Sequence, residues 1–183
     1  GSLDLLIDAL GSHDDLQDEL LAAIACRTSK RDLERAIERF KDATGALKGR
    51  LSEAFRRMGL PGEQAMAALL EADIASLKPY IVETLEAQGY VEARIQELKH
   101  RDPKIRREAA SALSNVGSVS AFRGIVLAAR DPDPEVRVAV TRALERLAGP
   151  EGASMLAELE SDPNPRVRKY VLWAMERVRA KSL

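Results

Sequence analysis

The stretch Asp-Pro-Lys-Ile-Arg at residues 102–106 returns as Asp-Pro-Glu-Val-Arg at residues 133–137 and as Asn-Pro-Arg-Val-Arg at residues 164–168. Both intervals are 31 residues long. A fixed period of this size is typical of stacked supersecondary units, in which each unit buries its apolar face against its neighbours. The repeat therefore predicts an array of stacked units rather than a single globular core.

The first two residues of each copy predict the start of a helix. Asp102, Asp133 and Asn164 carry a short side-chain oxygen that can accept a hydrogen bond from the free amides of a first helical turn. A proline follows each of them, and proline suits the first helical position because the amide it lacks has no partner there. Apolar residues then recur at the spacing of one helix face. The equivalent members of this stripe are Ile105, Val136 and Val167, then Ala109, Val140 and Val171, then Leu113, Leu144 and Met175.

A shorter helix is expected before each of these proline-capped helices, so residues 90–183 should contain three regular repeats. The connections within each pair are short, which favours antiparallel neighbours. The expected helices are 91–100 with 103–116, 120–130 with 134–148, and 152–160 with 165–179.

Residues 3–89 keep the spacing but lose the motif, and three further pairs are expected there. In the third of these pairs, Ile74 lies 31 residues before Ile105 and should begin the second helix, with Asp73 as its cap. Pro79 falls inside that helix and should kink or shorten it. The pairs within residues 3–89 are either degenerate repeats or an unrelated helical cap, and the spacing favours degenerate repeats. The predicted fold class is all-α, with about six antiparallel helix pairs.

The repeated motif, followed by small and aliphatic residues at these spacings, resembles HEAT repeats and is most similar to the short class found in phycobiliprotein lyases. The resemblance is specific over residues 90–180 and weak over residues 3–89. It implies a right-handed superhelical solenoid whose second helices line a concave groove, and a scaffold that binds proteins or peptides.

The resemblance also implies a structural ladder between neighbouring units, with an acidic or amide residue and an arginine contributed by each unit. The residues that match it are Asp102 and Arg106, Asp133 and Arg137, and Asn164 and Arg168. An arginine repeated beside the apolar stripe can also bind a cap or a loop carbonyl of the next unit. Asn164 has no charge, so the last rung is expected to be weaker.

Residues that could carry chemistry form no catalytic pattern. His13 and His100 are far apart and lack the ligand spacing of a zinc site. Cys26 has Arg27 and Lys30 nearby, and such charges can activate a thiol, although an unused thiol is the simpler interpretation. Some HEAT-like proteins are di-iron hydroxylases with His-Glu dipeptides, which this sequence lacks. We therefore expect no catalytic residue, no metal and no cofactor.

Composition limits the compartment and the partner. No apolar run approaches the about 20 residues that cross a bilayer, and a single cysteine excludes an internal disulfide and fits a reducing compartment. A cytoplasmic location is therefore expected. The net charge is −1, but basic residues outnumber acidic ones in residues 90–183 and the reverse holds in residues 1–89. This asymmetry could favour an acidic partner for the second half.

The positions of the second helices that lie outside the apolar stripe are expected to face the groove. Apolar character at these positions rises towards the C-terminus, and exposed aromatic residues beside arginines are typical of interaction hot spots. The predicted partner-binding residues are Arg107, Val138, Arg142, Lys169, Leu172 and Trp173. The competing interpretation is that Leu172 and Trp173 pack at the end of the array.

The favoured function is a non-catalytic scaffold that binds a protein or peptide in its groove. A phycobiliprotein or bilin lyase-type subunit is one alternative, although no chromophore-specific residue is evident. Nucleic-acid binding is another, because a HEAT-like fold is also used by alkylpurine DNA glycosylases with an aromatic and acidic pocket. Tyr170, Trp173 and Glu176 are the candidates for such a pocket. Carboxylates interspersed among the basic residues disfavour this alternative.

Overall fold

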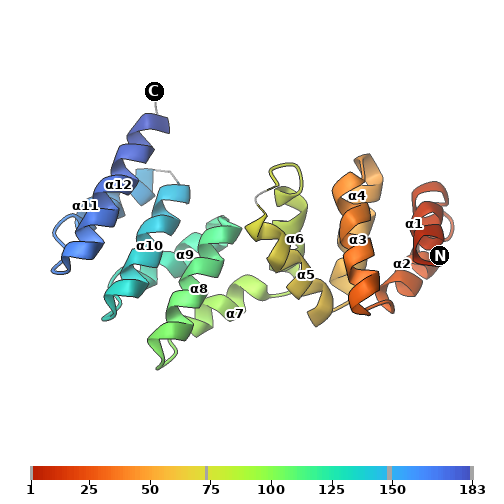
Figure 1. The fold of residues 1–183 in the computed structure, drawn as a ribbon, viewed down its shortest axis with the longest axis horizontal. Helices are drawn as coiled ribbons and strands as arrows, with labels where there is room; N and C mark the ends of the chain where they lie inside the picture. The colour runs from red at the N-terminus through yellow and green to blue at the C-terminus, as the bar shows by residue number, and fades with distance from the viewer. Residues whose placement is uncertain (1, 73, 148–149, 182–183) are drawn as a thin grey trace. The chain divides into compact units, whose positions relative to one another are not determined.

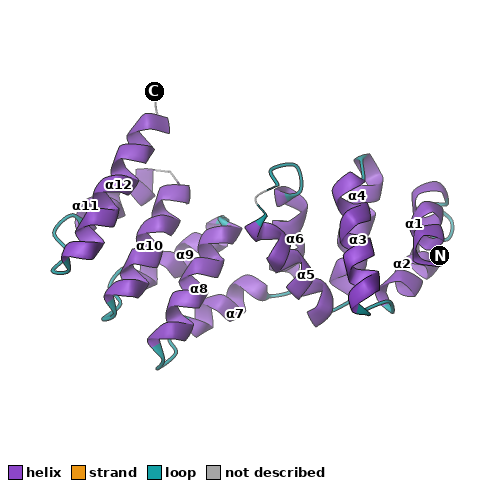
Figure 2. Cartoon of the chain, viewed as in Figure 1, coloured by secondary structure: helices purple, strands orange, loops and turns teal. Residues whose placement is uncertain are grey.

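The computed structural model describes residues 2–72, 74–147 and 150–181, and every regular element within these ranges is an α-helix (Figure 2). Twelve helices occur in the described ranges, so the predicted all-α class and the six helix pairs are confirmed for them. The chain divides into two compact units, residues 1–90 and residues 91–183, and each has its own packing.

The second unit is built from three consecutive helix pairs. The second helices of the pairs, α8, α10 and α12, lie side by side, and the first helices α9 and α11 pack against them from behind (Figure 1). The pairs are α7 (Tyr90–Glu97) with α8 (Pro103–Val116), α9 (Val119–Ala128) with α10 (Pro134–Leu147), and α11 (Pro150–Leu159) with α12 (Pro165–Lys181). Ala148, the expected last residue of α10, lies outside the described residues.

The three capping residues predicted from the motif begin the three second helices. Asp102 Oδ1 accepts a hydrogen bond from the amide of Lys104 at 2.8 Å. Asp133 Oδ1 accepts from the amide of Glu135 at 2.8 Å, and Asn164 Oδ1 accepts from that of Arg166 at 2.9 Å. Each of these bonds satisfies an amide of the first turn that has no partner within the helix, so the short repeated motif is enough to set where α8, α10 and α12 begin.

Small and branched side chains fill the core between the two layers of the second unit. Val136, Val140 and Val171 are fully buried, as the apolar stripe predicts. Gly124 of α9 shows how closely the helices approach, since an added Cβ would lie 2.7 Å from Ile95 Cγ1 of α7 and 3.1 Å from Leu113 Cδ1 of α8. A core of this composition brings helix backbones close together and leaves little room for larger residues.

The first unit has the same two layers, although it lacks the motif. The helices α2, α4 and α6 are neighbours in one layer, and α1, α3 and α5 are neighbours in the other. Phe40 and Phe55 join α3 to α4 through an edge-to-face contact with ring centroids 5.6 Å apart. The helices of this unit are α1 (Ser2–Ser12), α2 (Gln17–Ala25), α3 (Lys30–Asp42), α4 (Gly45–Arg57), α5 (Leu60–Glu71) and α6 (Lys78–Ala87).

The start of α6 differs from the prediction. The helix was expected to begin at Ile74, but it begins at Lys78 and holds Pro79 within its first turn. A proline in the helix interior would remove an amide donor and clash with the preceding turn, so the helix starts where the proline is tolerated. The expected shortening is confirmed and the expected start is wrong. Asp73, the predicted cap, lies outside the described residues.

Candidate partner-binding groove

Two partly buried arginines link neighbouring helix pairs of the second unit. Arg106 donates from Nε and Nη2 to the two carboxylate oxygens of Asp131, at 2.7 and 2.9 Å. Arg137 makes the same two bonds to Asp162 at the same distances. The Nη1 atom of each arginine donates to carbonyls of the turn before its own helix, such as that of His100 for Arg106. Each arginine therefore fastens its own turn to the carboxylate of the next repeat.

The acid in each rung is not the one expected from the sequence. Asp133 and Asn164 use their side-chain oxygens to cap α10 and α12, as Asp102 does for α8. The rungs instead contain Asp131 and Asp162, which lie two residues earlier. This part of the ladder prediction was wrong, because an oxygen that accepts from its own first turn is directed at its own helix. The expectation of a weaker rung at Asn164 is therefore also wrong, because Asn164 caps its own helix as Asp133 does.

Arg168 occupies the equivalent position in the last repeat. Its Nη1 atom donates to the carbonyls of Asp162 and Pro163, at 2.7 and 3.1 Å, as the other two arginines do in their own turns. Within the described ranges it makes no ion pair with a carboxylate. The last arginine is therefore anchored on one side only.

The rung between Arg137 and Asp162 also affects the ionisation of its acid. The Arg137 guanidinium holds the pKa of Asp162 below its ordinary value through their hydrogen bonds, although burial of the carboxylate acts in the opposite direction. The amide of Asn164 donates to the same carboxylate at 2.8 Å and lowers this pKa further. Asp162 is therefore charged at neutral pH despite its burial.

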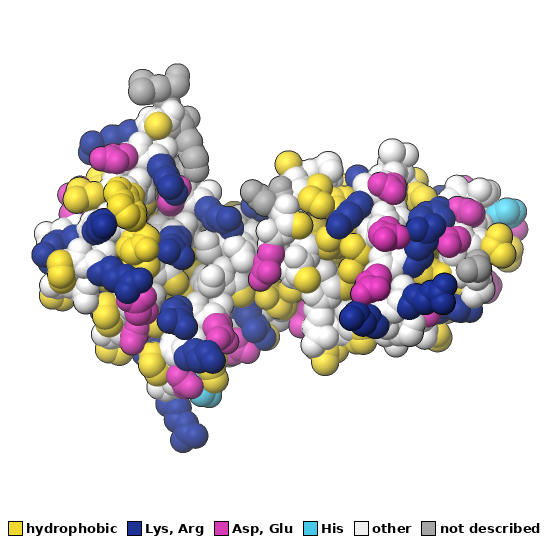
Figure 3. All heavy atoms as spheres, viewed as in Figure 1, with side chains coloured by type: hydrophobic (Ala, Val, Ile, Leu, Met, Phe, Trp, Pro, Cys, Tyr) yellow, Lys and Arg dark blue, Asp and Glu magenta, His cyan; other side chains and the backbone are white. Residues whose placement is uncertain are grey.

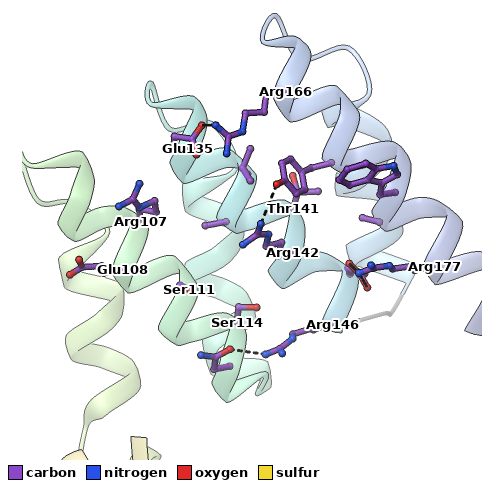
Figure 4. Close-up of a pocket in the computed structure, with 17 residues that line it drawn as sticks. Arg107, Glu108, Ser111, Ser114, Glu135, Thr141, Arg142, Arg146, Arg166 and Arg177 are labelled. Atoms are coloured by element: carbon purple, nitrogen blue, oxygen red, sulfur yellow. Dashed lines mark hydrogen bonds and ion pairs between the residues drawn. The ribbon is translucent and has the colours of Figure 1, made fainter. Parts of the chain in front are cut away.

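A groove of about 870 Å³ crosses the exposed face of α8, α10 and α12 (Figure 4). Each helix contributes equivalent positions of the repeat to it, so that the same three rows run across the three helices. The rows are Glu108, Ala139 and Tyr170, then Ser111, Arg142 and Trp173, then Asn115, Arg146 and Arg177.

The charge of this groove is positive, whereas the chain as a whole has a net charge of −1. Five arginines and three glutamates line it. Figure 3 shows dark-blue Lys and Arg side chains mixed with yellow hydrophobic side chains over α8, α10 and α12. Two of the arginines are neutralised, since Arg166 pairs with Glu135 at 3.0 Å and Arg177 pairs with Glu145 at 3.3 Å.

The other groove arginines bind neutral groups or project into the groove. Arg142 Nη2 donates to the Tyr170 hydroxyl at 3.3 Å, and Arg146 Nη1 donates to Asn115 Oδ1 at 2.6 Å. Arg107 is exposed. Among the described residues, none of these three arginines forms an ion pair. Their charge is therefore available to a group that enters the groove.

Two aromatic rings form the wall of the groove on α12. Trp173 is 46% exposed and meets Tyr170 edge to face at 5.3 Å between ring centroids. The Arg142 guanidinium lies 5.0 Å from the centre of the Tyr170 ring, and Lys169 Nζ lies 4.8 Å from that of Trp173. The hydrogen bond from Arg142 also lowers the pKa of the Tyr170 hydroxyl. An exposed aromatic surface is thus held among cations.

The six predicted partner-binding residues are distributed unevenly over this face. Arg107, Arg142 and Trp173 line the groove with exposed side chains. Val138 also borders it but is only 4% exposed, which corrects the expectation that it offers a surface to a partner. Lys169 contacts the Trp173 ring, whereas Leu172 is 56% exposed outside the groove lining.

The reason for this distribution is that α10 packs between α8 and α12. The face opposite the apolar stripe was expected to be free, but Ala110 and Thr141 on that face are buried, and α10 packs against both α8 and α12. Neither Arg146 nor Arg166 was among the predicted partner-binding residues, and only the repeat position that Arg146 shares with Arg177 could have indicated the first of them.

The remaining candidate residues lie apart from the groove. His100 Nδ1 accepts from the amide of Asp102 at 3.0 Å, the role that Asp131 and Asp162 have in the later repeats. Cys26 is exposed in the first unit. In residues 2–72, 74–147 and 150–181 no group of three or more His, Cys, Asp or Glu side chains could hold a metal ion. None of the helices described is both long enough and apolar enough to cross a membrane.

Comparison with known proteins identifies the repeats. Residues 91–176 match the family model described as HEAT repeats, which is the part of the chain that carries the motif. No curated protein sequence matches the chain.

The solved structures that match the chain include designed and natural proteins. A designed armadillo repeat protein in complex with the peptide (KR)4 is 15% identical, with 97% of this chain and 100% of that chain covered and a TM-score of 0.44. The complex of CpcE and CpcF of phycocyanin lyase from Nostoc sp. PCC7120 is 18% identical, with coverage of 80% and 99% and a TM-score of 0.47. An engineered protein is 16% identical, with coverage of 98% and 97% and a TM-score of 0.44.

Proposed function

We propose, from the premise that residues 91–176 are HEAT repeats, that this segment is a non-catalytic interaction module. Its groove across α8, α10 and α12 binds a segment of another protein. The observation that carries the proposal is that one groove combines the exposed Trp173 with arginines that no described carboxylate neutralises. Aromatic and arginine side chains dominate the energetics of many interfaces, and side chains already held by neighbours lose little freedom on binding.

The test is capture of a partner by the full chain from a lysate of its source, followed by titration of the purified partner. Trp173 is the single tryptophan of the chain, so its fluorescence reports directly on the groove. We expect a protein that binds the wild type and shifts this emission. We expect binding of this partner to be lost with Arg142→Glu and retained with Arg123→Glu. Arg123→Glu is a matched charge reversal at an exposed position of α9 outside the groove lining. A partner that binds all three chains equally well would contradict the proposal.

Nucleic acid is the competing occupant, because the groove carries excess positive charge beside two aromatic rings. Phosphate contacts produce a steep loss of affinity as salt rises. The same fluorescence titration with single-stranded and duplex DNA and RNA, at low and physiological salt, separates the two occupants. Binding of nucleic acid that survives physiological salt and is lost with Arg142→Glu would replace the protein partner by nucleic acid.

We also propose that residues 3–89 are degenerate repeats of the same kind rather than an unrelated cap. The support is the layer arrangement of the first unit, in which α2, α4 and α6 form one row and α1, α3 and α5 form the other. An unrelated helical cap has no reason to keep a separate row for the first and the second helix of every pair.

A further inference from the structure

We infer that the groove selects an extended peptide segment with an acidic residue and, about three residues away, an apolar residue. The acidic side chain is received by Arg142 and Arg146 on α10, and the apolar side chain rests on Trp173 of α12. This inference rests on the proposed function and names the chemistry of its partner.

The charge of the groove is concentrated on α10. The ion pairs of Arg166 with Glu135 and of Arg177 with Glu145 cancel most of the charge elsewhere. On α8, Arg107 and Glu108 are adjacent residues of opposite sign in the same lining.

When Glu108 is counted against Arg107, the positive charge that remains is that of the guanidinium groups of Arg142 and Arg146, one helical turn apart on the same face. A cationic pair of this kind favours an anionic group and repels a basic one.

Both arginines of α10 are oriented and retain unused donors. A guanidinium has five N–H donors in a planar arrangement. The hydrogen bonds to Tyr170 and to Asn115 occupy one nitrogen of each arginine and hold the side chains over the groove. The donors that are left can bind a carboxylate in a bidentate manner, which is the geometry that arginine recognises best.

The apolar part of the pattern follows from Trp173. Its ring is half exposed, and its contacts with Tyr170 and Lys169 fix it from within its own helix. An aliphatic or aromatic side chain laid against this ring would bury surface that is now in water. Burial of this kind contributes about 25 cal/mol for each Å² of apolar area.

The interval of three residues comes from the spacing of the helices. Packed helices lie about 8–10 Å apart, and a peptide in the extended polyproline II conformation advances about 3.1 Å for each residue, with every third side chain on the same side. A peptide that crosses from α10 to α12 therefore places side chains about three residues apart on successive helices. Arg142 and Trp173 occupy the same repeat position on these two helices, so they are opposite one another across this interval.

The experiment uses synthetic peptides and the emission of Trp173 in the full chain. The first probe is a ten-residue serine and glycine peptide that contains Glu-Glu-Ser-Ser-Leu, and a second probe has the reverse order. One control replaces both glutamates by lysine, and the other places the leucine next to the glutamates. We expect one of the two spaced acidic probes to bind about tenfold more tightly than either control, because the controls lose the charge match or the spacing.

Protein variants complete the test. The double variant Arg142→Glu and Arg146→Glu should reverse the preference, so that the lysine peptide binds more tightly than the glutamate peptide. The neutral variant Arg142→Gln and Arg146→Gln should abolish the preference. Its result replaces that of the charge-reversed variant if the charge reversal impairs folding. Arg123→Glu should leave the preference unchanged.

The inference is overturned if acidic and lysine peptides bind equally, or if no acidic probe shifts the Trp173 emission up to millimolar concentration. The proposed function is judged separately by protein capture. If a captured partner is lost with Arg142→Glu while the acidic peptides fail, the groove binds a partner of other chemistry. If the captured partner and the peptides both ignore Arg142→Glu, the groove itself is not the binding site.

Discussion

Removal of the Arg137 side chain should strongly destabilise the second unit. The single substitutions Arg137→Ala and Arg106→Ala should each lower its free energy of unfolding more than a substitution of any other arginine there. Arg137 and Asp162 form a bidentate ion pair whose side chains are only 11% and 3% exposed. In Arg137→Ala the Asp162 carboxylate keeps the amide of Asn164 as a donor but loses its cation. A buried charge without its partner costs far more than a lost surface contact.

The expected loss for Arg137→Ala is about 3–5 kcal/mol in the free energy of unfolding. Arg168→Ala is the matched comparison, because Arg168 makes the same two carbonyl contacts and no ion pair within the described ranges. Arg168→Ala should lower the free energy of unfolding by about 1 kcal/mol, the usual net contribution of such hydrogen bonds at a partly exposed site. The difference between the two variants isolates the contribution of the carboxylate.

The assay is urea denaturation, followed by far-ultraviolet circular dichroism for the whole chain and by Trp173 emission for the second unit. A double-mutant cycle with Arg137→Ala and Asp162→Asn should give a coupling of about 2–3 kcal/mol, since the residues share one buried contact. A loss for Arg137→Ala no larger than that for Arg168→Ala, or a coupling near zero, would refute the reasoning.

Three further predictions concern acid, backbone packing and the groove. Arg137 keeps the pKa of Asp162 below its ordinary value, so this pair stabilises the fold fully above the ordinary carboxyl pKa and the stability is lost as the pH falls through the lowered folded-state pKa. Acid titration by circular dichroism should therefore show a smaller loss of stability in Asp162→Asn than in wild type, and equal losses would contradict the assignment. Gly62→Ala should lower the melting temperature, because its Cβ would lie 1.9 Å from a backbone oxygen of α4. The added Cβ of Gly49→Ala meets no atom within 4 Å, so this variant should raise the free energy of unfolding by about 1 kcal/mol. Similar melting temperatures for the two variants would count against close packing at Gly62. Trp173→Ala should weaken partner binding with little change in melting temperature, and the converse result would mean that this half-exposed ring packs rather than binds.

Local features could be predicted from the sequence because they depend on residues close together in the chain. The caps at Asp102, Asp133 and Asn164 and the bounds of α8 follow from a proline, a short polar side chain and an apolar stripe. The late start of α6 was missed because the periodic apolar residues continue through a segment that Pro79 keeps out of the helix.

The partners of the ladder arginines depend on contacts between repeats. The residues that bind Arg106 and Arg137 lie 25 positions away in sequence, and the turn that binds Arg106 contains two eligible acids, Asp131 and Asp133. Asp-Pro precedes the cap in both turns, at Asp131 and Asp162, and this second repeated signal was available but was not used. The choice between the acids depends on which oxygen is already engaged by its own helix.

The 31-residue period, the helix caps and the buried stripe are properties of the chain itself, since each follows from residues within one or two helical turns. Only the packing of α10 between α8 and α12 decided which side chains remain in water. That packing buries Val138 and Thr141 and leaves Arg142 and Trp173 accessible, although all four lie outside the apolar stripe. Exposure depends on the neighbouring helix, and no pattern within one helix contains that information.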